Sequence, residues 1–285
     1  MSSADAKTRS GRFVGQSVPR QPAKRLVEGR GVYVDDIALP RLAHVAYLRS
    51  PHAHARIVSI DTTKAATMPG VIRVATGADF ASVKRFAGVL AHFKGMKSAE
   101  APVIAVDKVC WNGEPVAAVV AETRHQAEDA AEAIDVIYEP LPVVVDIETA
   151  TAPATPVIHP EIGDNMCFSR ELDAGDFDAA LAKADRIVER TFRFPRHTGV
   201  CLEGRSVAAD WSRAEQRLTV YISHQAPNMV QDTYAHLLGL TEAQVRGGVD
   251  IGASSRPPAE PALREPAPFV DGAPVELARA RLAVV

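Results

Sequence analysis

The chain has 285 residues, 47% of them apolar and 24% charged, a globular composition with enough length for two compact domains. Its formal net charge of -3 excludes a global electrostatic attraction to nucleic acid or to an anionic membrane. No stretch approaches the roughly 20 apolar residues of a membrane span, and the N-terminus lacks the apolar core of a signal peptide. We therefore expect a cytoplasmic protein that does not bind nucleic acid.

A basic arm, residues 1–24, precedes the first predicted domain, residues 25–146. Short apolar runs separated by turns are typical of strands. Residues 56–76 accordingly predict a strand, a short helix and a second strand. The first predicted domain is therefore expected to contain both strands and a helix near its start.

The clearest helical pattern of this domain is ETRHQAEDAAEAIDV, residues 122–136. Its alanines and Ile134 recur at helical spacing, between apolar runs that begin at Pro115 and Val136. Parallel strands need a crossover of this kind. The pattern therefore predicts a β-α-β unit with parallel strands.

A proline-rich stretch with no sustained period, residues 147–165, predicts a linker between two domains. The second domain, residues 166–252, opens with a helix for which Asp176 is the expected N-cap. Leu181 and Ala184 are expected on one face of that helix. Further elements are predicted as strands over residues 187–194, 206–211 and 217–223, and as a helix from about Asn228 to Leu238.

The sequence WNGEPVAA predicts a tight turn that feeds a buried strand. Gly113 permits a positive φ, and the ring of Pro115 fixes its own φ. Glu114, between them, is expected to belong to this turn.

His52 and His54 in SPHAHARI raise the question of a metal site, because imidazole is a common ligand. Their spacing of two predicts that both lie on one side of a strand. No carboxylate or cysteine motif completes a ligand set around them. Packing within the fold is therefore the preferred interpretation, and we predict no metal-ligating residue.

The three cysteines, Cys110, Cys167 and Cys201, are far apart in the sequence and form no C-x-x-C pair. This spacing favours neither an iron-sulfur cluster nor a thiolate zinc site nor a disulfide framework. A reducing compartment fits it best.

Several dense motifs are shared with one known family. The block from Gly29 to Phe80, with RSPHAHARI and MPGV, is followed by WNGEPVAAVVAETRHQAEDAAEAIDVIYEPLPVVVD and HQAPNMVQDTYAHLLGL. In this order the motifs resemble the large subunit of the molybdenum hydroxylases, the family of xanthine dehydrogenase, aldehyde oxidase and aerobic carbon monoxide dehydrogenase. The resemblance covers residues 11–252.

The resemblance implies an α+β fold class. Residues 25–146 would form an α/β hammerhead domain, and residues 166–252 the incomplete start of the molybdopterin-binding domain. The family oxidatively hydroxylates an aldehyde, an N-heterocycle or a CO-type substrate at a molybdenum ion held by molybdopterin. Electrons then leave through iron-sulfur and FAD-binding subunits, which are the implied partners.

Gln225 in ISHQAPN matches a family glutamine whose amide lies beside an oxo ligand of the molybdenum. An oriented N–H donor there would stabilise negative charge. The alternative is that Gln225 only closes a strand-to-helix turn. Glu203 matches a family glutamate that we interpret as architectural, with Arg205 or backbone N–H groups as its partners, because an unpaired buried charge is costly.

The family pattern stops after Gly252, where a turn of the form D-x-G-G-x-F-G is expected and DIGASSRPPAE stands instead. Residues 253–285 are rich in Ala, Pro and Arg and are expected to be disordered. We hypothesise that a frameshift or truncation replaces the rest of the family chain, which carries most cofactor contacts and the general base. No catalytic residue is therefore assigned, and no cofactor is expected on this chain alone.

Three functional interpretations remain open at this point. The chain is part of a molybdenum hydroxylase that a second polypeptide completes, or a non-catalytic module that docks on the iron-sulfur or flavin subunit, or a gene remnant without function.

Overall fold

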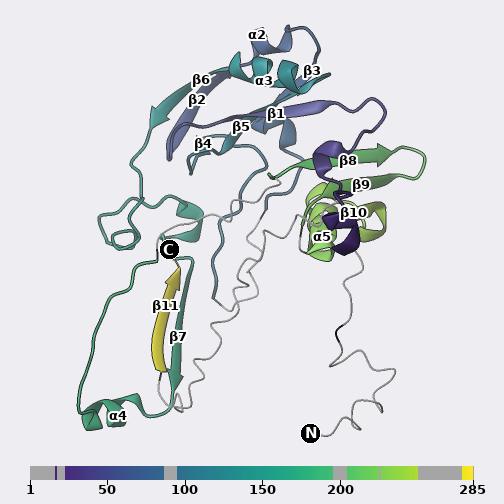
Figure 1. Cartoon of the computed structure of the whole chain (residues 1–285). Coiled ribbons are helices and arrows are strands. Elements are labelled where there is room, and N and C mark those ends of the chain that lie inside the picture. Colours follow the sequence, from purple (N-terminus) through teal and green to yellow (C-terminus); the bar gives the residue numbers. More distant parts are fainter. Residues whose placement is uncertain are drawn as a thin grey trace, which may run out of the picture. The chain divides into compact units, whose positions relative to one another are not determined.

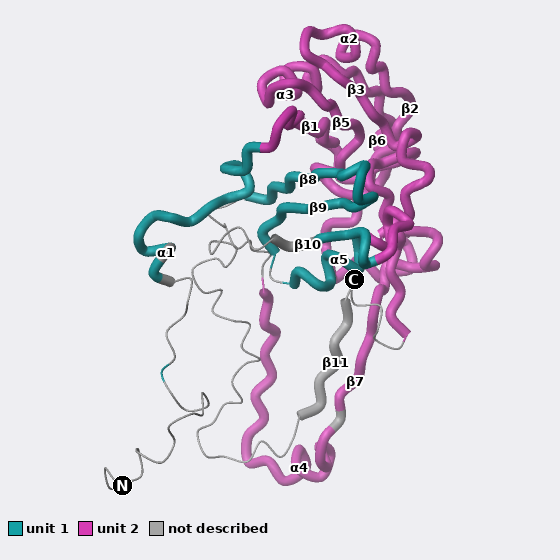
Figure 2. The backbone as a smooth tube through the Cα atoms, turned by 90° about the vertical axis from the view of Figure 1, so that its right-hand side faces the viewer, with its two compact units in different colours: residues 1–38, 197–234, 242–265 teal, residues 39–196, 235–241, 266–285 magenta. Residues whose placement is uncertain are grey.

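The computed structural model describes residue 17 and residues 23–86, 95–194, 204–224, 226–249 and 278–284. The chain divides into two compact units, coloured separately in Figure 2. The first unit contains residues 1–38, 197–234 and 242–265, and the second contains residues 39–196, 235–241 and 266–285. Strands and helices are mixed in both (Figure 1), which confirms the α+β class.

One sheet of the second unit has the strand order β1-β5-β3. β5 (Pro115–Ala121) pairs on one edge with β1 (His44–Arg49) and on the other with β3 (Val71–Thr76), both antiparallel. Five of its seven residues are buried, because a central strand of alanine and valine is covered on both faces.

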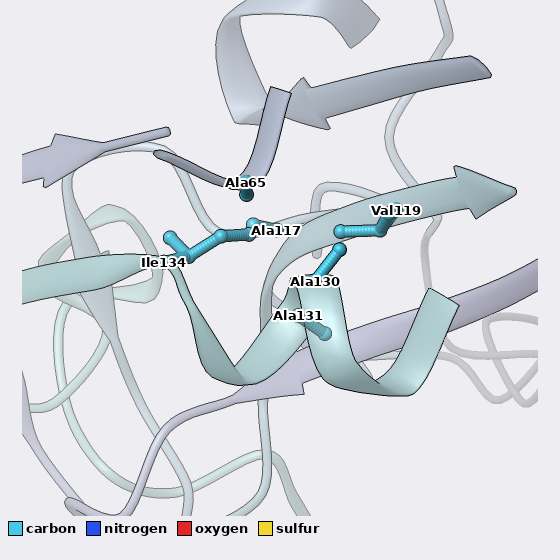
Figure 3. Close-up of a cluster of buried hydrophobic side chains, with 6 residues drawn as sticks. All are labelled: Ala65, Ala117, Val119, Ala130, Ala131 and Ile134. Atoms are coloured by element: carbon cyan, nitrogen blue, oxygen red, sulfur yellow. The ribbon is translucent and has the colours of Figure 1, made fainter. Parts of the chain in front are cut away.

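Helix α3 (Arg124–Glu132) packs on this sheet, and its buried face consists of alanines. Small side chains allow the helix backbone to approach the strands closely, so a compact core forms from little side-chain volume. Figure 3 shows this core, which contains Ala65, Ala117, Val119, Ala130, Ala131 and Ile134.

The start of α3 is fixed by hydrogen bonds that the sequence encodes locally. Thr123 is the N-cap: its hydroxyl accepts the N–H of Gln126, and the Gln126 side chain accepts the N–H of Thr123. Gly70 lies against this cap with φ +78°, and a Cβ there would come within 2.3 Å of the Gln126 amide. Only glycine fits this position without strain.

A second sheet has the order β4-β2-β6. β2 (Ala55–Asp61) pairs antiparallel with β4 (Lys108–Val109) and with β6 (Asp135–Pro140). A second buried cluster contains Ala55, Ala105, Val109 and Val116. Val116 lies on β5, so successive residues of that strand serve both clusters, as strand geometry requires.

The order strand, short helix, strand over residues 56–76 is confirmed by β2, α2 (Thr63–Ala66) and β3. The prediction of a parallel β-α-β unit around α3 is wrong. β5 already pairs on both edges, so the chain leaving α3 enters the other sheet as β6, antiparallel to β2. Helical spacing predicted the helix but carried no information on which sheet the next strand joins.

The first unit contains a sheet of order β10-β9-β8. β8 (Val207–Ser212) and β9 (Arg217–Ile222) form an antiparallel hairpin. α5 (Pro227–Leu238) then connects β9 to β10 (Val245–Val249), which runs parallel to β9. A β-α-β connection thus exists in this protein, at β9-α5-β10.

The remaining helical elements are short. Asp176 caps α4 (Phe177–Lys183), and its carboxylate accepts the N–H of Ala179 at 2.9 Å, as expected. Ala184, which was expected on the same face of this helix as Leu181, instead follows its end. The short helical elements are α1 (Ala23–Val27), η2 (Val34–Asp36), η3 (Gly77–Phe80), η4 (Pro160–Ile162), α4 (Phe177–Lys183) and η5 (Glu242–Gln244).

Two segments differ from their predictions. The strand expected over residues 187–194 does not form: this stretch lies outside every strand recorded in the described parts of the chain. In the tail expected to lack structure, β11 (Ala278–Val284) instead pairs antiparallel with β7 (Phe168–Ala174). Residues 253–277 lie outside the described residues.

The predicted turn before β5 forms, with Gly113 at φ +88°. Glu114 is 3% exposed, and its carboxylate accepts the N–H of Cys110 at 2.6 Å. The backbone of the turn is bound to the end of β1, because Ser50 N–H donates to the Glu114 carbonyl and Gly113 N–H donates to the Ser50 carbonyl. Burial raises the pKa of Glu114, and backbone N–H groups oppose this.

We expect Thr123→Ala to lower the free energy of unfolding by about 1 kcal/mol, because the cap of α3 is lost. Thr62→Ala is the matched control, since Thr62 is the N-cap of α2 but makes no side-chain cap hydrogen bond. Urea unfolding followed by circular dichroism measures both. Equal effects of the two substitutions would contradict the role of the Thr123 hydroxyl.

We expect Glu114→Gln to change how stability depends on pH. Because the folded-state pKa of Glu114 is raised, its contribution is full below the unfolded pKa and is lost as pH rises through the folded pKa. The variant should therefore gain stability relative to the parent as pH rises from about 4 to 7, by about 1.4 kcal/mol per unit of pKa shift. Unfolding midpoints across this range test it.

Glu132→Gln is the control for this experiment, because it removes an exposed carboxylate at the end of α3. A Glu114→Gln curve that runs parallel to the parent curve at every pH would contradict the prediction.

Candidate functional site

The candidate site is the edge of the first unit's sheet at which β9 and β10 end. The two strands are parallel, and Tyr221 near the end of β9 pairs with Val249 at the end of β10. Parallel neighbours have their carboxyl ends at one edge, where ligands of open α/β sheets bind. β9 and β10 therefore end at the same edge of the sheet.

The segment after β9 enters α5 within a few residues. His224 Nδ1 accepts the N–H of Ala226 at 3.0 Å, and Pro227 begins the helix, where its missing N–H costs nothing. Gln225 lies between these residues but outside the described ones. Its role beside a cofactor therefore stays a prediction.

After β10 the family pattern has a glycine turn, in whose place this chain has DIGASSRPPAE from Asp250 on, and this segment too lies outside the described residues. The start of β10 is held by Gln231 on α5, whose Nε2 donates to the carbonyls of Glu242 and Val245 at 2.9 and 2.7 Å. Sequence reasoning missed this bond. The position of Gln231 in the sequence pattern of the helix does not distinguish it from a solvent-exposed glutamine.

The expected pair of Glu203 and Arg205 is only partly covered by the structure. Glu203 lies outside the described residues, and Arg205 is exposed. The architectural role of Glu203 therefore stays a prediction.

The two histidines lie in the loop before β2, so the expectation that both face one side of a strand is wrong. The His52 ring packs edge-on against Tyr138, with 4.9 Å between ring centroids. His54 is buried, and its Nδ1 lies 2.7 Å from the Pro142 carbonyl oxygen. Both side chains are thus used in packing the loop onto the region around β6.

A cavity of about 320 Å³ lies in the second unit beside the turn that precedes β5. Cys110, Glu114 and Glu161 line it together with Lys108, whose Nζ donates to the Ile158 carbonyl at 2.6 Å. Burial raises the pKa of Cys110, so the thiol is the favoured form and a nucleophilic role is disfavoured. The pKa of Glu161 is lowered, first by its own backbone N–H and then by its contact with His159.

Among the residues with described positions, no group of three or more His, Cys, Asp or Glu side chains is arranged to hold a metal ion. None of the described helices is both long enough and apolar enough to cross a membrane. Cys110 and Cys167 are free thiols.

Two family models match the chain. Residues 28–142 match the a/b hammerhead domain of aldehyde oxidase and xanthine dehydrogenase, and residues 158–250 match a molybdopterin cofactor-binding domain. The second match contains the whole β9-α5-β10 segment.

Curated relatives agree with these models. The nicotine 6-hydroxylase large subunit of Paenarthrobacter nicotinovorans is 36% identical over 81% of this chain and 28% of its own length. The carbon monoxide dehydrogenase large chain of Afipia carboxidovorans is 35% identical over 78% of this chain and 28% of its own length. The chain thus spans just over a quarter of these relatives.

Solved structures agree as well. Quinoline 2-oxidoreductase from Pseudomonas putida 86 matches 81% of this chain and 29% of its own, with a TM-score of 0.74 and 34% identity. The aldehyde oxidoreductase from Desulfovibrio gigas matches 83% of this chain and 26% of its own, with a TM-score of 0.74 and 28% identity. The sequence motifs, the two domain matches and these structures agree, and the chain belongs to the xanthine dehydrogenase, aldehyde oxidase and carbon monoxide dehydrogenase family of molybdenum hydroxylase large subunits.

Proposed function

We propose that this chain supplies the hammerhead domain and the first part of the molybdopterin-binding region of a molybdenum hydroxylase large subunit. The observation that carries the proposal is the parallel pairing of β9 and β10, with Tyr221 opposite Val249. That pairing ends both strands at one sheet edge, and the segments that follow them in the sequence are the two that the family resemblance links to the cofactor. Gln225 follows the first strand and residues 250–252 follow the second.

The residues described at this edge do not by themselves fit a molybdopterin. Two cavities in the described part of the chain, of about 320 and 350 Å³, are lined by residues of the second unit, so neither of them lies at this edge. A ligand of this kind is normally buried by about 70 to 90% in a pocket built from several elements. We therefore propose that the 285 residues alone neither retain the cofactor nor turn over a substrate.

Within a completed site, Gln225 is the residue of this chain that we assign to the cofactor. Its amide would donate an N–H to an oxygen on the metal, and such a donor stabilises negative charge without reorganising. The molybdenum centre would supply the oxidative hydroxylation chemistry of the family. The substrate, an aldehyde, an N-heterocycle or a CO-type molecule, would be chosen by residues outside this chain.

The partners would be an iron-sulfur subunit and an FAD-binding subunit. This assignment is supported by the relatives, which are described as the large chain of a carbon monoxide dehydrogenase and as the gamma subunit of a 6-hydroxypseudooxynicotine dehydrogenase complex. Such names denote one component of an assembly with several chains.

A non-catalytic docking module is a second candidate function. It is favoured by the hammerhead domain, which has two buried clusters of its own, built around Ala117 and Val116. A domain with this much internal packing can fold and bind a partner subunit without a complete molybdenum site.

Elemental analysis tests the proposal. We expect the purified 285-residue chain, produced in a host that makes molybdopterin, to contain molybdenum only at background level, because the pocket is incomplete. The carbon monoxide dehydrogenase large chain of Afipia carboxidovorans, produced in the same way, is the positive control. Molybdenum near one equivalent per chain would contradict the proposal.

A pull-down with iron-sulfur and FAD-binding subunits then separates the two candidate functions. Capture of these subunits by a chain that never gains molybdenum, even with the rest of a family large subunit present, would favour the docking module. Molybdenum incorporated only in the presence of that additional polypeptide would favour the proposed enzyme component.

A further inference from the structure

The segment DRIVERTFRF, residues 185–194, follows α4 and has an unusual surface. The exposed fractions of its large apolar side chains are 67% for Ile187, 78% for Val188, 90% for Phe192 and 88% for Phe194. Figure 2 shows the segment as a single extended stretch that leaves α4. Four such side chains within eight residues form a concentrated apolar surface, and surfaces of this kind mark interaction sites.

The sequence of the segment is that of a β-strand. Valine, isoleucine, threonine and phenylalanine are the residues enriched in strands. In an extended strand residues two apart share a face, so Val188, Phe192 and Phe194 would lie together on one side and Ile187 and Thr191 on the other. The strand propensity of the segment and the exposure of its apolar side chains therefore both indicate that it pairs with a sheet that the described residues do not contain.

The described residues supply no such sheet. No strand recorded in them pairs with residues 185–193. An ion pair joins Arg193 to Glu148, and both side chains are more than half exposed. Exposed pairs of this kind stabilise little, so the ion pair does not explain why the apolar side chains remain uncovered.

The comparisons show how much of a family large subunit lies outside this chain. The match to a molybdopterin cofactor-binding domain spans residues 158–250, so the segment lies inside that domain. The two solved structures with TM-scores of 0.74 are each more than three times as long as the part of them that matches this chain. Most of the polypeptide that could provide a neighbouring strand therefore lies outside the 285 residues.

We propose that residues 185–194 add as a β-strand to an exposed sheet edge of the polypeptide that carries the rest of the molybdopterin-binding region. Backbone hydrogen bonds would provide affinity in this contact, and pockets for Val188, Phe192 and Phe194 would provide specificity. The inference rests on the proposed function, because it names the element through which this chain joins its complement.

The test uses the full chain, with the part of the Afipia carboxidovorans carbon monoxide dehydrogenase large chain beyond its matched region as the co-expressed probe. Val188→Pro removes a backbone N–H from the segment and should weaken capture of the probe at least tenfold. Val145→Pro is the matched control, since Val145 is also an exposed valine outside any helix or strand. The control should bind the probe as the parent chain does.

Hydrogen exchange distinguishes this strand from other contacts. We expect the amides of residues 185–193 to exchange rapidly in the free chain and at least tenfold more slowly in the complex. Equal capture by Val188→Pro and the parent, or unchanged exchange in the complex, would overturn the strand proposal. If either result is found and the complex of the chain with the probe also gains molybdenum, the proposed function is retained although the strand proposal is overturned.

Two further outcomes also count against the proposal. A parent chain that fails to capture the probe would overturn it, whereas the proposed function is judged by molybdenum content with a complementing chain. Light scattering that shows a dimer of this chain, lost in Val188→Pro and kept in Val145→Pro, would identify a second copy as the occupant instead.

Discussion

The second unit depends on the close packing of α3 against β5. The strand pairs on both edges, the helix presents alanines to it, and Ile134 leads from the helix into the other sheet. Because small side chains set the distance between helix and sheet, a larger residue at Ala130 or Ala117 would have to displace one of the two elements. The glycine at position 70 completes this arrangement, since it lets the chain pass directly beside the cap of α3.

Local signals in the sequence predicted local structure well. The alanine spacing located α3, Asp176 located the start of α4, and Gly113 marked the turn before β5. Each of these depends on residues within about four positions of one another, where capping and turn chemistry operate. The dense motifs also identified the family, which the domain matches and relatives confirm.

Non-local features could not be predicted in this way. Helical spacing cannot reveal that β5 has both edges occupied, so β6 was assigned to the wrong sheet. The strand expected at residues 187–194 has the right propensity, but a strand forms only where a partner edge exists. Of the candidate site, the sequence pointed to Gln225, whereas the parallel pairing of β9 with β10 and the bond from Gln231 follow only from the fold.

The β9-α5-β10 connection also orders the folding of the first unit. β8 and β9 are joined by a four-residue turn and can pair early, whereas β10 must wait for α5 to form and cross over. Pairings between distant segments form more slowly than hairpins because a longer loop must close first. During synthesis on a ribosome, the edge of β9 that β10 later covers would therefore remain unpaired while α5 is being made. In that interval a strand of another chain could pair with this edge.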